Sequence, residues 1–170
     1  MAANRKIKIG ISSCLLGNNV RYDGGNKLDQ SLIDAFGESV EWVPICPEVG
    51  AGLPVPREPM QLIADGRKVR CVTIETKQDL TDIIANWAAE RLTDLEQEDI
   101  RGFVFKARSP SCAMRDAPIA RPSDVIPGAG IFARALMRRY PLLPVADEEN
   151  LRDASFRERF MAKVLAYTGL

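Results

Sequence analysis

Three short strand-like segments, each followed by a cysteine, constrain the fold of this chain more than any other feature. The segments are residues 6–12, 40–45 and 102–106, and the cysteines are Cys14, Cys46 and Cys112. The first segment alternates polar and apolar residues before it becomes small and apolar, which is typical of a strand that enters a loop. Helix-like segments separate the strands, and this alternation is typical of a parallel sheet. We therefore predict an α/β fold, a three-layer, Rossmann-like open parallel sheet with a small β-hairpin insertion.

Apolar residues at helical spacing predict the positions of the helices. They cover residues 28–36, 79–95, 131–139 and 156–167. The first helix should end at Gly37, because glycine commonly caps the C-terminus of a helix. Residues 141–145 are expected to form a fourth strand. No repeat or linker-like composition divides the chain, so we expect a single domain over residues 1–170.

The hairpin insertion is expected over residues 60–76. Asp65-Gly66 lies between two strand-like runs, and this dipeptide is a strong signal for a tight turn. A loop should follow Cys112 and continue to Pro127. The segment Gly128-Ala129-Gly130 then opens a helix, where the glycines allow either close packing of the helix or binding of an anion by backbone N–H groups.

The three strand-end cysteines should meet at one edge of the sheet. Loops at the carboxyl ends of parallel strands converge on one crevice, where open α/β sheets bind their ligands. The fourth cysteine, Cys71, lies in the middle of a strand with no loop beside it, so we assign it to the core. The other three have Ser, Pro or Gly neighbours and polar residues nearby.

The chain contains no histidine, which excludes Ser-His-Asp and Cys-His catalysis and metal sites with His ligands. Lys and Arg (23 residues) balance Asp and Glu (23 residues), so neither nucleic acid nor an anionic membrane is the default partner. Residues 1–8 carry basic side chains, but the apolar stretch after them is too short for a signal peptide or a membrane span. The expected location is cytoplasmic, where disulfides are disfavoured.

Besides core packing, the residues alone leave three explanations for these thiols. Three thiolates around one crevice fit an iron–sulfur cluster with one open iron, since cubane clusters otherwise take four cysteines. A structural zinc site would need a fourth ligand, either Cys71 or a carboxylate. In a thiol-dependent enzyme, Cys112 would be the nucleophile, activated by Lys106 or by a helix N-terminus.

Several blocks of residues, in order along nearly the whole chain, resemble the thiouracil desulfidase family. The blocks are Ile11-Ser12-Ser13-Cys14-Leu15-Leu16-Gly17, Val20-Arg21-Tyr22-Asp23-Gly24-Gly25, Cys46-Pro47-Glu48-Val49, Gly52-Leu53 with Pro56-Arg57, Lys106-Ala107-Arg108-Ser109-Pro110-Ser111-Cys112 and Gly128-Ala129-Gly130-Ile131-Phe132. The chain departs from the family pattern at Asn26, where His is usual, and at Ala113, where Gly is usual. The segment after Ile131 is most similar to the version that is fused to a second domain in enzymes acting on thiouridine in RNA.

The resemblance implies a [4Fe-4S] cluster held by three cysteines, Cys14, Cys46 and Cys112. Its open iron would bind the sulfur of a thiolated pyrimidine such as 2-thiouracil, and water would replace that sulfur without net redox change. The products would be the oxo base and sulfide. Neither departure from the family pattern removes one of these ligands.

By the same resemblance, Glu48 is the proton-transfer carboxylate, and Ser109 is a hydroxyl that orients substrate or sulfur, with Ser111 the less expected choice. The residue types agree with this assignment. Without histidine, a carboxylate two residues after a ligand cysteine is the best-placed base. The alternative for Glu48 is a salt bridge within the loop, with Arg57 or Arg21.

Tyr22, Asp23 and Lys106 are further candidates for contact with the substrate. Tyr22 can stack on a pyrimidine, and Asp23 can accept a hydrogen bond from a ring N–H. Lys106 can offset the negative charge of the cluster and of the departing sulfide. Alternatively, Tyr22 and Asp23 belong to a tight turn that only shapes the pocket wall. The alternative for Lys106 is a position at a solvated strand end.

A free thiolated base or nucleoside is the expected substrate, because the net charge is zero and the chain stops at Leu170 without the second domain. Desulfidation of thiouridine in tRNA is the alternative. A different class is a non-catalytic iron–sulfur or zinc module that senses or stores sulfide with the same cysteines. Replacing Glu48 separates the classes, because only the enzyme would lose its function.

Overall fold

A four-stranded parallel sheet forms the centre of the structure. The computed structural model describes residues 5–169. The strands follow the order β2 (Val40–Ile45), β1 (Ile7–Ser12), β5 (Phe103–Phe105) and β8 (Val145–Asp147), and each pairs in parallel with its neighbours. After β1, the chain forms β2 on one side of β1 and later forms β5 on the other side of β1. The strand order therefore reverses at β1, which creates a topological switch point at the carboxyl ends of these strands.

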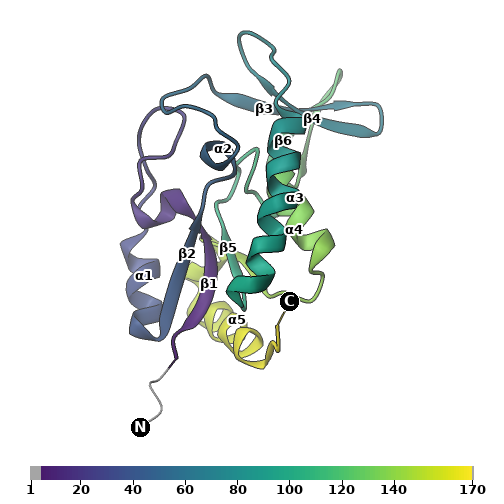
Figure 1. The fold of residues 1–170 in the computed structure, drawn as a ribbon. Coiled ribbons are helices and arrows are strands. Elements are labelled where there is room, and N and C mark those ends of the chain that lie inside the picture. The colour runs from purple at the N-terminus through teal and green to yellow at the C-terminus, as the bar shows by residue number, and fades with distance from the viewer. Residues whose placement is uncertain (1–4, 170) are drawn as a thin grey trace.

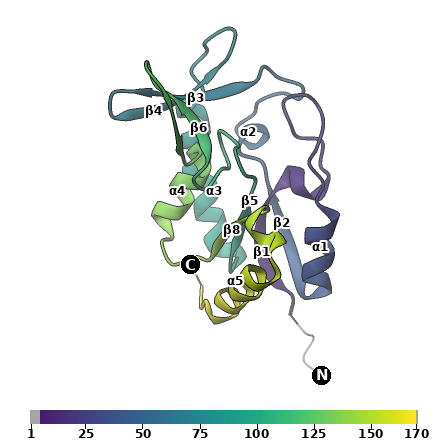
Figure 2. The same cartoon turned by 180° about the vertical axis from the view of Figure 1, so that it is seen from behind.

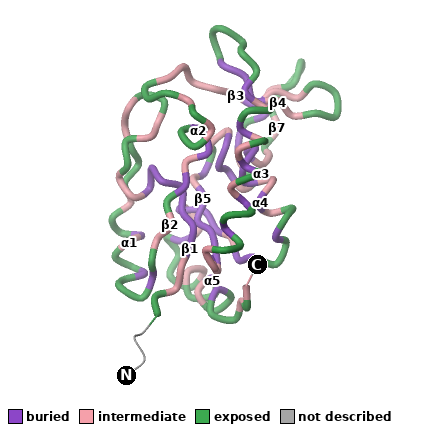
Figure 3. Tube along the Cα trace, viewed as in Figure 1, coloured by how far each residue is buried: buried purple, intermediate pink, exposed green. Residues whose placement is uncertain are grey.

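Helices cover both faces of this sheet, as Figures 1 and 2 show. They are α1 (Gln30–Phe36) and α5 (Ala154–Ala166) on one face, and α3 (Thr81–Glu98) and α4 (Ile131–Arg139) on the other. Side chains of β5 alternate between the faces: Val104 packs with α1 and α5, whereas Phe103 and Phe105 pack with α3 and α4. The buried central strands stand out in Figure 3. The predicted three-layer, Rossmann-like α/β fold is confirmed.

The helices lie where their apolar spacing predicts them. α1 ends at Gly37, whose N–H donates a hydrogen bond to the Ile33 carbonyl. α4 has the predicted bounds, whereas α3 continues to Glu98 instead of ending at Leu95.

The fourth strand of the sheet lies later in the chain than predicted. β8 covers Val145–Asp147, whereas the strand was expected over residues 141–145. Proline cannot donate to a strand ladder, and two prolines interrupt this segment. The chain before β8 forms a turn instead, closed by a hydrogen bond from the Leu143 N–H to the Tyr140 carbonyl. The shift places Glu148 directly after the strand.

A second four-stranded sheet lies above the carboxyl ends of the first, at the top of Figure 1. Its strands follow the order β4 (Lys68–Thr73), β3 (Met60–Asp65), β6 (Ala117–Ala120) and β7 (Val125–Gly128). β3 and β4 form the expected hairpin, and Gly66 adopts the left-handed conformation that its turn requires (φ 62°).

The segment expected to be a loop after Cys112 contains two of these strands. β6 and β7 pair antiparallel, and β6 pairs in parallel with β3. Pro118 and Pro127 lie opposite each other in the ladder, and prolines obscure the strand pattern in so short a segment. Ala117 and Ile119 nevertheless belong to the core of this sheet. The hairpin is therefore part of a larger sheet and not an isolated insertion.

Short helical segments complete the fold. They are η1 (Ser13–Leu16), η2 (Gly37–Ser39), α2 (Pro47–Gly50) and η3 (Asn150–Arg152). η1 contains Cys14, and α2 begins directly after Cys46. Each of these short helices therefore helps to position one strand-end cysteine. Within residues 5–169, no helix combines the length and the apolar character needed to cross a membrane.

The N-terminus of α4 packs on the loop that carries Cys112. Backbone N–H groups of the helix donate to carbonyl oxygens of the loop, in the pairs Gly130–Ala113, Ile131–Pro110 and Phe132–Ser111. Because these donors are already used, the contacts support the close-packing interpretation of the glycine segment and not anion binding. A Cβ atom on Gly130 would lie 2.5 Å from the Ser111 carbonyl carbon, so only glycine fits here.

We expect Gly130→Ala to lower the free energy of unfolding by about 1–3 kcal/mol, since overpacking forces the backbone to shift. Chemical denaturation measures this loss. Gly25→Ala is the control, because its new methyl group would face only the exposed carboxylate of Asp23. Equal losses in the two variants would contradict the role of the close approach at Gly130.

Candidate functional site

The three strand-end cysteines line one cavity of about 480 Å³. Cys14 follows β1, Cys46 follows β2, and Cys112 lies in the loop after β5. The cavity lies at the switch point of the parallel sheet, where such sheets bind ligands. Met60, the first residue of β3, also lines it, so the second sheet contributes to the wall. Residues far apart in the sequence are thus brought to one space whose volume is typical of a ligand site.

Burial favours the protonated form of these three thiols. It raises the pKa of Cys14 to about 11 and the pKa of Cys112 to about 12, and it also raises the pKa of Cys46. The positive charge of Lys106 acts on the Cys14 pKa in the opposite direction. All three are free thiols, and metal ligation would release their protons.

The donor set suits an iron–sulfur cluster. Thiolates are the usual ligands of such clusters, and three of them leave one iron of a four-iron cluster open. Within residues 5–169, no three Cys, Asp or Glu side chains lie close enough together to hold a single metal ion. The three thiols are instead distributed around the cavity wall.

Cys71 does not line this cavity. It is fully buried in the core of the second sheet, where its Sγ lies 3.8 Å from the Met60 Sδ. Its position agrees with the core role expected from the sequence. It does not supply the fourth ligand that a zinc site would need.

Glu48 lies in the wall of the same cavity, buried against Arg57. Its Oε2 accepts hydrogen bonds from the Arg57 Nε (2.8 Å) and Nη2. Its Oε1 accepts a hydrogen bond from the Ser111 Oγ (2.9 Å). The salt bridge with Arg57 considered from the sequence is therefore present, and Glu48 nevertheless remains part of the cavity wall.

The two serines of the Cys112 loop have different partners. Ser111 is buried and donates to Glu48, whereas the Ser109 Oγ accepts a hydrogen bond from the Cys112 N–H (3.0 Å). The two hydroxyl oxygens lie 3.2 Å apart. Ser109, Ser111 and Glu48 thus form a continuous chain of polar contacts, in which Ser111, the less expected serine, touches the carboxylate.

Lys106 lines the cavity and forms an ion pair with Glu148, with 2.5 Å between Nζ and Oε1. Glu148 is buried and also accepts a hydrogen bond from the Ala107 N–H (2.8 Å). Lys106 is therefore a fixed cation and not a solvated strand end. Sequence reasoning missed Glu148 because the fourth strand was placed too early. With the correct bounds, this residue directly follows a strand, as Cys46 does.

Comparison with known proteins decides the family. A model of the 2-thiouracil desulfurase family matches residues 9–148. The chain belongs to the 2-thiouracil desulfurase family. An uncharacterized protein, YbbK of Bacillus subtilis (strain 168), is 30% identical over 107 residues, which are 60% of this chain and 70% of that protein. The solved structure of a [4Fe-4S]-dependent thiouracil desulfidase, TudS, is 31% identical with a TM-score of 0.70, and the match covers 91% of this chain and 99% of that chain.

The family resemblance found in the sequence is therefore confirmed. The matched range contains all three cavity cysteines, Glu48 and both serines of the Cys112 loop. Asn26, one departure from the desulfurase pattern, donates a hydrogen bond to the Asn19 side chain (2.8 Å). Ala113, the other departure, is fully buried beneath the second sheet.

In this desulfurase-family chain, Tyr22 and Asp23 lie on an exposed loop beside the cavity. Tyr22 lines the cavity and is 41% exposed, and the Arg21 guanidinium lies 5.6 Å from the centroid of its ring. Asp23 is not among the lining residues, and its Oδ1 accepts a hydrogen bond from the Gly25 N–H (2.9 Å). The geometry supports contact with a ligand for Tyr22 and a turn-forming role for Asp23.

A second cavity, of about 650 Å³, adjoins the desulfurase-family site. Lys27, Lys106 and Arg108 line both cavities. These three cations therefore form the boundary between the two spaces.

We expect the cavity cysteines of the iron-free protein to react slowly with iodoacetamide at pH 8. Alkylation requires a thiolate, and a thiol such as Cys14, whose pKa is about 11, is almost wholly protonated at that pH, whereas an ordinary cysteine with a pKa of about 8.5 is not. The rate should rise as the pH approaches the raised pKa. Mass spectrometry gives the labelling rates, with free cysteine as the reference. Rapid labelling of Cys112 at pH 8 would favour the thiol-nucleophile hypothesis instead.

Proposed function

We propose that this protein is an iron–sulfur-dependent desulfidase that converts a thiolated pyrimidine to its oxo form and releases sulfide. The substrate would be 2-thiouracil or a related base or nucleoside, and a [4Fe-4S] cluster would be held by Cys14, Cys46 and Cys112. One observation carries the proposal: thiols from three strand ends and the buried carboxylate of Glu48 surround the same cavity. Family membership and the likeness to a [4Fe-4S]-dependent thiouracil desulfidase support the same chemistry.

The proposed reaction exchanges a C=S bond for a C=O bond without net redox change. Water contributes the oxygen, the carbon–sulfur bond breaks, and the sulfur leaves as sulfide. When bound, a cluster with one open iron would supply a Lewis acid for the thiocarbonyl sulfur. Glu48 would accept the proton from water, since it lies in the cavity wall and the chain has no histidine for this role.

Other side chains of the cavity would position the substrate. Ser109 would orient the substrate or the sulfur, and Ser111 would hold the Oε1 atom of Glu48 through its hydrogen bond. Lys106 would offset the negative charge that accumulates as sulfide departs. Tyr22 would stack on the pyrimidine from the exposed side of the cavity.

A free base or nucleoside is favoured over RNA, because the positive and negative charges of the chain balance. Desulfidation of thiouridine in tRNA is the alternative. Sulfide release from thiouracil, thiouridine and thiolated tRNA, measured in parallel, separates these substrates. If thiolated tRNA is the true substrate, kcat/KM should be highest on tRNA.

Anaerobic reconstitution tests the proposal directly. A cluster with an open iron is oxygen-labile, which fits a cytoplasmic protein, since thiols stay reduced in that compartment. The reconstituted protein should show broad visible absorbance, contain iron and sulfide in equal amounts, and release sulfide from 2-thiouracil. Protein that binds no iron, or that binds iron but acts on no thiolated pyrimidine, would contradict the proposal.

A further inference from the structure

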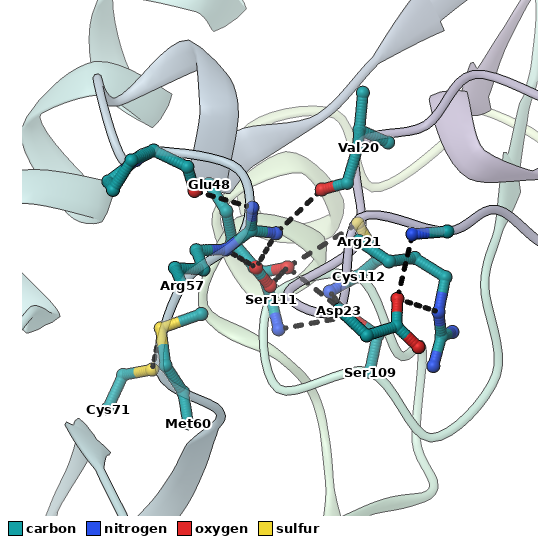
Figure 4. Close-up of polar contacts among 12 residues, drawn as sticks. Val20, Arg21, Asp23, Glu48, Arg57, Met60, Cys71, Ser109, Ser111 and Cys112 are labelled. Carbon is teal, nitrogen blue, oxygen red and sulfur yellow. Dashed lines mark hydrogen bonds and ion pairs between the residues drawn. The ribbon is translucent and has the colours of Figure 1, made fainter.

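Arg57 connects three parts of the site, as Figure 4 shows for Glu48 and Val20. Its side chain is only 6% exposed, and that of Glu48 is 11% exposed. Besides its two contacts with Glu48, the guanidinium donates from Nη2 to the Val20 carbonyl (2.7 Å) and from Nη1 to the Pro54 carbonyl (3.1 Å). A single buried cation thus contacts the carboxylate of the site, the loop that carries Val20, and its own loop at Pro54.

The contacts between Arg57 and Glu48 all involve one carboxylate oxygen. Nε and Nη2 both donate to Oε2, while Oε1 accepts a hydrogen bond from the Ser111 Oγ (2.9 Å). A carboxylate held by a planar guanidinium on one side and a hydroxyl on the other cannot rotate without losing a hydrogen bond. Arg57 therefore fixes the orientation of the Glu48 carboxylate, with one oxygen on the guanidinium and the other on Ser111.

Arg57 also holds the loop of residues 18–27 against the site. Its backbone N–H donates to the Tyr22 carbonyl (2.8 Å), in addition to the guanidinium contact with Val20. Val20, Arg21 and Tyr22 all line the cavity. One of the two hydrogen bonds that hold this part of the wall is thus made by the same side chain that orients Glu48.

We propose that Arg57 is a positioning residue that couples the orientation of Glu48 to the position of loop 18–27 over the cavity. The part that concerns Glu48 rests on the proposed function, whereas the contact with the loop is independent of the reaction. Lysine cannot replace Arg57 fully, because its single ammonium lacks the planar fork that contacts Glu48 and Val20 together.

The coupling to Glu48 is tested by introducing Arg57→Met into the wild-type protein and into the Glu48→Gln variant. In the reconstituted wild-type background, kcat should fall about 100-fold, as expected when a catalytic group is misplaced by about 1 Å. In the Glu48→Gln background, the same substitution should change kcat by less than about twofold, because groups that act as a unit are not additive. Arg121→Met is the matched control. It breaks an exposed salt bridge with Asp124 and should leave kcat unchanged.

The contact with the loop is tested by limited trypsin digestion, which does not depend on activity. Cleavage after Arg21 should be at least about tenfold faster in Arg57→Met than in the wild-type protein, because local opening controls proteolysis. Glu48→Gln should keep the wild-type cleavage rate, since the contact between Arg57 and Val20 remains. If Arg57→Met does not fold, Arg57→Lys, which keeps the cation, is used in both measurements.

The possible results separate the two proposals. A loss of kcat that is equal in both backgrounds, or absent from both, overturns the coupling to Glu48, and unchanged cleavage after Arg21 overturns the coupling to the loop. If the wild-type protein releases no sulfide, or if Glu48→Gln is fully active, the proposed function fails. In that case the trypsin result still decides whether Arg57 holds the loop.

Discussion

Cys46→Ala should abolish both iron binding and sulfide release. Cys46 lies between β2 and α2 and contributes one of the three thiols of the cavity. With two thiolates left, a four-iron cluster would lose one of its anchors to the protein and would have two open irons. Iron content after anaerobic reconstitution should therefore fall to the background value. The visible absorbance and the sulfide release from 2-thiouracil should disappear with it.

Cys71→Ala is the matched control for this prediction, because the same chemical change is made at a thiol outside the cavity. Cys71 is fully buried in the core of the second sheet. The variant should lose about 0.5–3 kcal/mol of stability, as most single substitutions do, and should retain iron and activity. Iron retained by Cys46→Ala, or lost by Cys71→Ala, would show that a different set of ligands holds the cluster.

Glu48→Gln should lower kcat by about 10²- to 10⁴-fold, the usual contribution of general acid–base catalysis, and should leave the iron content unchanged. The amide has nearly the same size and can still form hydrogen bonds with Arg57 and Ser111. It cannot accept a proton from water at neutral pH. Stopped assays of sulfide release measure kcat, and iron analysis of the same samples shows that the cluster is retained.

Glu98→Gln is the control for the Glu48 prediction, since Glu98 forms its ion pair with Arg91 at the end of α3, outside the cavity. It should leave kcat unchanged.

The neutral side chain in Glu48→Gln also leaves the charge of Arg57 without its partner, so stability should fall by at most about 3–5 kcal/mol. Activity is therefore measured well below the unfolding temperature. Full activity of Glu48→Gln would remove the proposed base, and retained iron with no activity in the wild-type protein would favour the sulfide-sensing hypothesis.

Much of the central sheet was predictable because each strand carries its own local signal. The alternation in residues 6–12 predicted β1, the strand-like segment 40–45 predicted β2, and helical spacing predicted α3 and α4. The second sheet was predicted only in part. β6 and β7 are four residues each and contain Pro118 and Pro127, so their pairing with β3 has no periodic signal in the sequence.

In the site, too, the positions that follow from local signals were predictable, whereas contacts between distant segments were not. The strand-end argument predicted that Cys14, Cys46 and Cys112 would meet, because the carboxyl ends of parallel strands must share an edge. The partners of Glu48 were less accessible to sequence reasoning. Arg57 was one of two possible salt-bridge partners, and the hydrogen bond from Ser111 joins residues that are 63 positions apart.

The sequence by itself determined the chemistry that is available: thiols, carboxylates and hydroxyls without histidine, in blocks that belong to the 2-thiouracil desulfurase family. It also determined the alternation of strands and helices around the central sheet, since this depends on periodicity over a few neighbouring residues. Only the tertiary structure decided which of the two serines touches Glu48, that Lys106 is held by Glu148, and that Arg57 contacts both a carboxylate and a loop. These contacts join segments whose separation along the chain carries no periodic pattern. They exist because packing against the two sheets brings the segments together.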